Sequence, residues 1–225
     1  MIRIAIDGPG GAGKSSVAKE IAKELGIIYV DTGALYRTIA LHMLKKGISP
    51  SDNESVINEL GGFTLELTFL NGKQVILLDG EDVGDSIRTP EISMSASTVS
   101  AIKEVREFLL NTQRSIARNN SVIMDGRDIG TVILPYAEVK IFLTASPEAR
   151  AKRRYDELIA KGQKNVVYED VLAEMNERDT NDSTRAVAPA TAAADAILLD
   201  NTDLDFEGTV RRILEIVKEK TGISE

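Results

Sequence analysis

Short apolar runs alternate along this chain with longer segments in which apolar residues recur every three or four positions. Continuous apolar runs are typical of strands buried on both faces, and the periodic segments are typical of helices that cover a sheet. The pattern therefore predicts an α/β fold with a five-stranded parallel sheet flanked by helices. The predicted strands cover residues 2–6, 27–30, 122–124, 139–143 and 197–199.

The predicted helices have recognisable ends. Val17, Ile21 and Leu25 recur at four-residue intervals, and Gly26 stands where a helix commonly ends. Residues 51 to 54 read SDNE, which predicts a capping box at the start of a short helix. The remaining predicted helices cover residues 34–46, 90–119 with a break near Ser100, 147–161, 168–178 and 205–220.

The periodicity changes to strict alternation after residue 64. Leu65, Leu67 and Phe69 alternate with polar residues, and Asn71-Gly72 predicts a type I′ turn before a second strand at 75–78. An antiparallel hairpin inside a chain of alternating strands and helices indicates a small inserted subdomain.

The bulk properties narrow the class of protein. The chain has 225 residues, a net charge of −8 and no cysteine. No apolar run approaches the roughly 18 residues of a membrane span, and the first residues are too short a run for a signal peptide. We therefore expect a soluble cytoplasmic protein. The acidic balance argues against binding to a nucleic acid polymer, whereas clustered arginines suit a small phosphorylated ligand.

The clearest motif follows the first predicted strand. Residues 8 to 15 read GPGGAGKS, which matches the phosphate-binding pattern GxxxxGK followed by Ser or Thr. Glycines let several backbone N–H groups point at one anion, and the helix that follows adds its dipole. Lys14 is predicted to reach the β and γ phosphates, and Ser15 to bind Mg²⁺. The expected ATP site comprises Gly8, Pro9, Gly10, Gly11, Ala12, Gly13, Lys14, Ser15 and Ser16.

A phosphate-binding loop alone does not separate a kinase from a switch, a motor or a nucleotide-sensing module. The NKxD string of guanine-specific switches and the LSGGQ string of transporter ATPases are both absent from the sequence. These absences favour a small-molecule kinase.

Several arginines lie at predicted strand ends and loops, where ligands collect in open α/β sheets. Arg37 follows the second strand, Arg127 follows the third, and Arg178 and Arg185 surround the loop after a helix. A guanidinium group stays charged and grips phosphate oxygens in a bidentate way. This distribution favours an acceptor that itself carries a phosphate.

The chain resembles the bacterial cytidylate kinases over essentially its whole length. The motifs that carry the resemblance are DGPGGAGKSS at 7–16, DTGALYR at 31–37, SAST at 95–98, VRE at 105–107, DGRDIGTVILP at 125–135 and ERDTNDSTRAVAP at 177–189. The resemblance implies transfer of the ATP γ-phosphoryl group to CMP or dCMP, and a monomer. It also implies a core of residues 1–36, 106–149 and 171–225, a monophosphate-binding insertion at 37–105 and a lid at 150–170.

The same resemblance implies a role for particular side chains. Arg37 and Arg127 would hold the acceptor phosphate, and Arg178 and Asp182 would face the sugar. The residues that would face cytosine are Ser97, Arg106, Asp128 and Arg185. With Lys14 and Arg127, the lid residues Arg153 and Arg154 would act in catalysis, and Arg150 beside them would belong to the same lid.

The chemistry agrees with these roles. A carboxylate such as Asp128 can accept from the C4 amino group of cytosine and would repel the carbonyl of uracil, while arginine can donate to O2 and N3. A phosphate monoester has a second pKa of about 6, so its oxygen needs no general base. Arginines of the lid would close over the phosphates and exclude water.

Some assignments stay open on the sequence alone. Tyr36 either contacts the acceptor or packs, Asp182 either binds the sugar or caps a turn, and Asp125 either holds a magnesium-bound water or ends a strand. The open alternatives for function are a kinase acting on AMP, UMP or GMP, a sensing module that binds ATP without turnover, and an RNA-associated protein.

Overall fold

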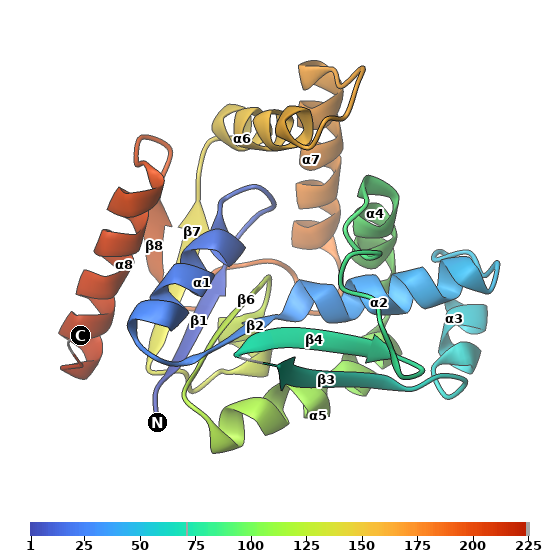
Figure 1. The fold of residues 1–225 in the computed structure, drawn as a ribbon, viewed down its shortest axis with the longest axis horizontal. Coiled ribbons are helices and arrows are strands. Elements are labelled where there is room, and N and C mark those ends of the chain that lie inside the picture. Colours follow the sequence, from blue (N-terminus) through green and yellow to red (C-terminus); the bar gives the residue numbers. More distant parts are fainter. Residues whose placement is uncertain (71, 224–225) are drawn as a thin grey trace.

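The computed structural model describes residues 1–70 and 72–223. Its centre is a parallel sheet of five strands in the order β2-β6-β1-β7-β8 (Figure 1). Each of these strands lies within two residues of its predicted bounds. The strands are β1 (Arg3–Asp7), β2 (Ile28–Asp31), β6 (Val122–Gly126), β7 (Val139–Thr144) and β8 (Ile197–Asp200).

Helices cover both faces of this sheet because its strands are apolar on both sides. Ile4 and Ile6 of β1 join a core with α1 (Lys14–Glu24) and α8 (Phe206–Thr221). Ala5, one residue out of phase, packs on the other face with α5 (Lys103–Asn119) and the short π-helix η1 (Ile129–Ile133). The predicted α/β class and five-stranded parallel sheet are confirmed.

A second, antiparallel sheet has the order β3-β4-β5. Leu70 of β3 pairs with Lys73 of β4, so the predicted hairpin is present, although Asn71 of its turn lies outside the described residues. The new elements are β3 (Leu65–Leu70), β4 (Lys73–Leu78), β5 (Glu81–Asp82), α2 (Thr32–Lys45), α3 (Asn53–Glu59) and α4 (Pro90–Val99). The hairpin and these helices share one core, which includes Ile39, Ile76 and Leu109.

Helices α6 (Pro147–Ala160) and α7 (Tyr168–Thr184) pack on each other around Ala151, Leu158 and Val171. In Figure 1 they stand above the sheet, on the side to which its strands' carboxyl ends point. The carboxyl ends of β1, β6 and β7 lie on this side of the sheet. From here the chain leaves β1 toward β2 on one side of the sheet and leaves β7 toward β8 on the other. Ligands of open α/β sheets bind at such a point.

Two local expectations differ from the structure. Helix α3 is capped by Asp52, whose side chain accepts from the Ser55 N–H, so the capping box predicted at Ser51 is wrong by one residue. Helix α7 runs on to Thr184, because its polar stretch after Arg178 still packs against α4. The break near Ser100 is confirmed, since α4 ends at Val99. Within the described residues, helices long and apolar enough to cross a bilayer are absent.

Candidate active site

The loop at residues 8 to 15 connects the carboxyl end of β1 to α1 and depends on glycine at two positions. A Cβ on Gly8, where φ is 142°, would lie 2.0 Å from the Leu143 carbonyl oxygen of the neighbouring strand. Gly13 has φ 85° and precedes the first turn of α1, whose N-terminus therefore opens toward the loop. Because a side chain is excluded at Gly8 and strained at Gly13, the loop can keep its backbone close to a bound anion.

Arg150 of α6 supports this loop through hydrogen bonds. Its guanidinium donates to the Gly10 carbonyl at 2.9 Å and to the Ala145 carbonyl at 2.9 Å, and it pairs with Asp179 at 2.5 Å. Asp179 in turn accepts from the Gly10 N–H at 3.3 Å. Arg150 is only 5% exposed. It therefore differs from the expectation that groups it with the lid arginines, because it is fixed in place as a support of the loop.

Lys14 is folded back over the loop. Its Nζ donates to the Pro9 carbonyl at 2.6 Å, and its side chain is buried. Burial, and then the nearby charge of Arg127, lower the pKa of Lys14 to about 7. An anion bound in the loop would oppose both effects and favour the charged ammonium.

Ser15, Asp125 and Tyr29 form a short hydrogen-bonded chain beside Lys14. Asp125 at the end of β6 accepts from the Ser15 hydroxyl at 2.7 Å through one oxygen and from the Tyr29 hydroxyl at 2.7 Å through the other. Burial raises the pKa of Asp125. The described residues contain no group of three or more acidic or imidazole side chains suited to hold a metal. A hydroxyl with one carboxylate behind it fits a Mg²⁺ ion that takes its other ligands from phosphates and water.

A cavity of about 710 Å³ opens over the loop and extends toward α4 and α7. Basic side chains come to it from several elements, together with the acids Asp31, Asp125, Glu157, Glu174, Asp179 and Asp205. The basic side chains are Lys14, Arg37, Arg88, Arg127, Arg153, Arg154, Lys161 and Arg178. The cavity thus combines the phosphate-binding loop with a wall in which basic side chains outnumber acidic ones.

Arg153 and Arg154 border the cavity from α6. Arg153 donates to the Asn201 side chain at 3.0 Å and to its carbonyl at 2.7 Å. Arg154 pairs with Glu157 of its own helix at 2.8 Å. In this arrangement both guanidinium groups are engaged by neighbours at the rim, and they would have to leave these partners to reach a phosphate.

Three arginines meet at the end of the cavity away from α6. Arg37 pairs with Asp31 at 2.8 Å, and Arg127 donates to Asp182 at 2.8 Å. The Nε of Arg178 is buried and has no hydrogen-bond partner among the described residues. Burial and the charge of Arg127 lower the pKa of Arg178 to about 10. Such crowding of positive charge is costly unless an anion joins it, which indicates a phosphate site.

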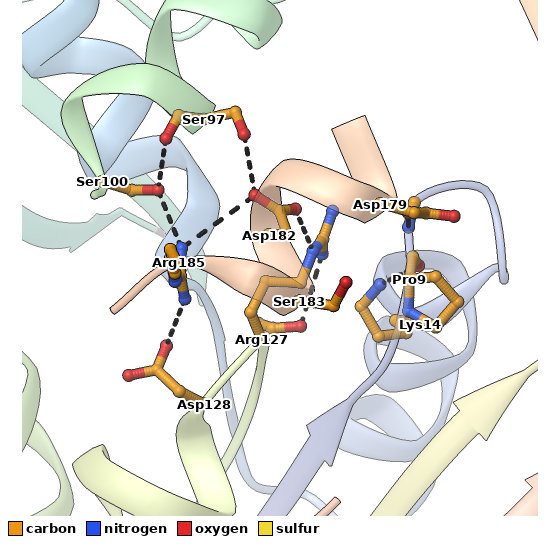
Figure 2. Close-up of polar contacts among 12 residues, drawn as sticks. Pro9, Lys14, Ser97, Ser100, Arg127, Asp128, Asp179, Asp182, Ser183 and Arg185 are labelled. Atoms are coloured by element: carbon orange, nitrogen blue, oxygen red, sulfur yellow. Dashed lines mark hydrogen bonds and ion pairs between the residues drawn. The ribbon is translucent and has the colours of Figure 1, made fainter. Parts of the chain in front are cut away.

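A buried polar cluster lies behind these arginines, between α4, α5, α7 and the residue after β6. Figure 2 shows Arg185 at its centre, with Ser100, Asp182 and Asp128 around it. Arg185 donates to the Ser100 hydroxyl at 2.9 Å and lies 3.7 Å from Asp128 and 4.0 Å from Asp182. Asp182 also accepts from the Ser97 hydroxyl at 2.7 Å.

Arg106 closes the cluster on its far side. It donates to Asp128 and to the Ser100 carbonyl, and its guanidinium lies 5.4 Å from the centre of the Tyr36 ring. Tyr36 is buried, and its hydroxyl has no hydrogen-bond partner in the part of the chain described. A carboxylate flanked by two guanidinium groups can read both a donor and an acceptor on the edge of a planar heterocycle.

The structure brings together every residue predicted for the acceptor, although they come from five segments of the chain. It also places two basic residues, Arg88 and Lys161, in the cavity wall, although the sequence did not single them out for a role. Arg88 precedes α4 and lies 3.8 Å from Asp31, which holds Arg37. Arg88 stands in a loop without a motif, so its basic charge shortly before a helix start was the one signal that could have indicated it.

The sheet order, the loop after its central strand and the cationic cavity define a P-loop kinase fold. A solved structure of an uncharacterized protein from Eubacterium ventriosum shares this fold with TM-score 0.51 at 14% identity, covering 97% of this chain and 99% of that one.

Sequence comparisons narrow the class to one family. The family model described as cytidylate kinase matches residues 4–219. Curated cytidylate kinases match from Caldicellulosiruptor bescii, 51% identical over 96% of this chain and 95% of the relative, and from Ligilactobacillus salivarius, 48% identical over 97% of each. The chain belongs to the cytidylate kinase family, and the resemblance found in its motifs is confirmed.

Proposed function

We propose that this protein phosphorylates CMP and dCMP with ATP, giving the nucleoside diphosphate and ADP. One observation carries the proposal beyond family membership. Asp128, flanked by Arg106 and Arg185, lies two residues after β6, at the same edge of the sheet as the phosphate-binding loop. Asp128 would thus contact the cytosine edge from the strand next to the one that leads into the loop for the donor phosphates.

The donor would bind over residues 8 to 16. Backbone N–H groups of the loop and the N-terminus of α1 would hold the phosphates, and Lys14 would turn from the Pro9 carbonyl toward the transferred group. Ser15 and Asp125 would hold Mg²⁺, the latter through water. The ion would neutralise charge on the phosphates.

The acceptor would enter from the opposite end of the cavity. Arg37 and Arg127 would hold its phosphate, and Arg178 would add its unpartnered Nε and face the sugar with Asp182. Ser97 would complete the pocket for the base. The acceptor oxygen is already ionised at neutral pH, so the protein's task is alignment and stabilisation of charge rather than proton removal.

The chain would close around both nucleotides by moving two parts. Residues 37–105 would form the monophosphate-binding insertion and residues 150–170 the lid, on a core of 1–36, 106–149 and 171–225. The packing supports this division, since most of the buried residues that share a core with the hairpin lie in the insertion, and α6 packs on the start of α7 in a small cluster of its own. Closure would bring Arg153 and Arg154 onto the phosphates. The enzyme would act as a cytoplasmic monomer on free nucleotides.

An acceptor profile tests the proposal. Purified protein with Mg²⁺ and ATP is offered CMP, dCMP, UMP, AMP and GMP in turn, and ADP formation is measured. We expect CMP and dCMP to be used with the highest kcat/KM. Faster turnover of UMP or AMP would show another monophosphate kinase, and ATP binding without acceptor-dependent ADP would show a sensing module.

We expect Tyr29→Phe to raise the Mg²⁺ concentration needed for half-maximal rate about threefold to tenfold. The variant removes the hydroxyl that donates to Asp125, so the carboxylate loses one of its two fixed partners. Titration of the rate with Mg²⁺ at saturating nucleotides measures the effect. Tyr155→Phe on α6 is the matched control, and an unchanged Mg²⁺ requirement in Tyr29→Phe would contradict the prediction.

We also expect ATP binding to take up a proton at pH 7.5 and not at pH 6. With its pKa at about 7, Lys14 is partly neutral in the free protein above that pH and charged below it. Bound phosphates restore the ammonium, so a proton enters only on the alkaline side. Calorimetry in buffers of different ionisation enthalpy measures the uptake. Lys14→Arg, charged at both pH values, should show less uptake, and equal uptake by both proteins would refute the assignment.

A further inference from the structure

The side chain of the N-cap residue, Asp128, does not cap the π-helix η1 that follows it. Asp128 occupies the N-cap position, where an aspartate side chain normally accepts from the backbone N–H groups of the first turn. Its carboxylate makes no such bond. It is turned away from η1, toward Arg106 and Arg185.

Another carboxylate does the capping instead. Asp7, the last residue of β1, accepts from the Ile129 N–H at 2.7 Å through one oxygen and from the Gly130 N–H at 2.7 Å through the other. It reaches them across more than a hundred residues of sequence, and it is 3% exposed. Both of its oxygens therefore bind backbone donors of the first turn, and one of these, the Gly130 N–H, is a donor that an N-cap side chain such as Asp128 would otherwise satisfy.

We propose that Asp7 is a positioning residue for acceptor recognition, which frees the Asp128 carboxylate for the base by capping η1 in its place. The inference rests on the proposed function, because it assigns a purpose to the base-reading role of Asp128. It also connects the two halves of the site, since the residue that precedes Gly8 of the donor loop sets the conformation of the acceptor loop.

The electrostatic setting agrees with this role. Burial raises the pKa of Asp7 to about 6, while the two N–H groups and the charge of Lys14 oppose that rise and Asp128 adds to it. Burial of a carboxylate is unfavourable for folding unless hydrogen bonds offset it, and here the two backbone N–H groups provide them. Neither oxygen of Asp7 is free to contact a nucleotide, which distinguishes it from a catalytic group.

The test is Asp7→Asn, assayed separately for each substrate. The amide keeps the shape but has one acceptor oxygen and one NH₂ group, and this group would face a backbone donor. One N–H of η1 then competes for Asp128. We expect KM for CMP to rise about tenfold and the preference for CMP over UMP to fall about tenfold, with KM for ATP within twofold of wild type. Asp52→Asn, which alters a carboxylate capping the exposed helix α3, is the matched control.

A double-variant cycle separates positioning from general support. If Asp7 acts through Asp128, Asp7→Asn should change the CMP-to-UMP preference much less in an Asp128→Asn background than in wild type. Equal rises in KM for ATP and CMP, or an undiminished preference in the single variant, would overturn the inference.

A milder variant keeps the inference testable if Asp7→Asn does not fold. A Cβ on Gly130 would lie 3.3 Å from an Asp7 carboxylate oxygen and 3.2 Å from the Lys140 Cδ, so Gly130→Ala disturbs the same contact without removing the charge. We expect a fall of about threefold in the preference for CMP, and a folded Gly130→Ala protein with wild-type preference would overturn the inference. A wild-type enzyme without preference for CMP would instead refute the proposed function itself.

Discussion

Lys14→Ala is expected to lower kcat for ADP formation by about 10³-fold or more, while the protein remains folded. The ammonium is the one cation that the donor loop itself supplies, and in the proposed complex it would leave the Pro9 carbonyl and contact the transferred phosphoryl group. Stabilisation of developing charge in a site that excludes water is commonly the largest single contribution to catalysis. Steady-state turnover with saturating CMP and ATP measures the loss.

The Lys14→Ala protein should be about as stable as the wild type. Lys14 is buried, and burial with the charge of Arg127 disfavours its charged form. Replacing it by alanine therefore removes an unfavourable charge together with one hydrogen bond, and we expect the midpoint of thermal unfolding to change little.

Lys23→Ala is the matched control for this prediction, since it lies on the exposed side of the same helix and pairs with Glu20. It should keep wild-type turnover. A Lys14→Ala enzyme with more than a tenth of the wild-type kcat would show that the loop backbone and the arginines suffice for transfer.

The donor half of the site could be predicted from the sequence because it is local. Residues 8 to 16 follow a strand and open a helix, so their positions relative to one another are fixed by a few backbone angles. The five strands and most helix ends were predictable for the same reason, since periodicity and capping are short-range signals.

The supports of the site could not be predicted in this way. Arg150 resembles its neighbours Arg153 and Arg154 in sequence, and only the packing of α6 under the loop shows that it is buried there. Asp7 at the end of β1 contacts η1, which follows β6, and Tyr29 on β2 reaches Asp125 on the neighbouring strand β6. Contacts between segments so far apart depend on strand order, which a single sequence does not specify.

Asp128→Asn is expected to lower kcat/KM for CMP by about 10 to 10²-fold and to change kcat/KM for UMP by less than tenfold. The carboxylate is the acceptor for the C4 amino group in the proposed complex, and each such contact to a base edge contributes about 1–3 kcal/mol of discrimination. An amide can donate to the C4 carbonyl of uracil, so it no longer rejects that base. The ratio of the two kcat/KM values, measured with saturating ATP, reports the change.

Loss of the Asp128 charge also leaves Arg106 and Arg185 without their shared partner. Removing one member of a buried ion pair costs about 3–5 kcal/mol, so the free energy of unfolding should fall as well. Asp195→Asn is the matched control, because it removes the partner of the buried Lys140 just before β8, whose opposite end faces the site. Because the Asp195 side chain is mostly exposed and Lys140 also donates to the Pro135 carbonyl, we expect little loss of stability and an unchanged acceptor preference. If Asp128→Asn loses CMP and UMP turnover in the same proportion, loss of stability rather than loss of a base contact explains the result, and the assignment of Asp128 is wrong.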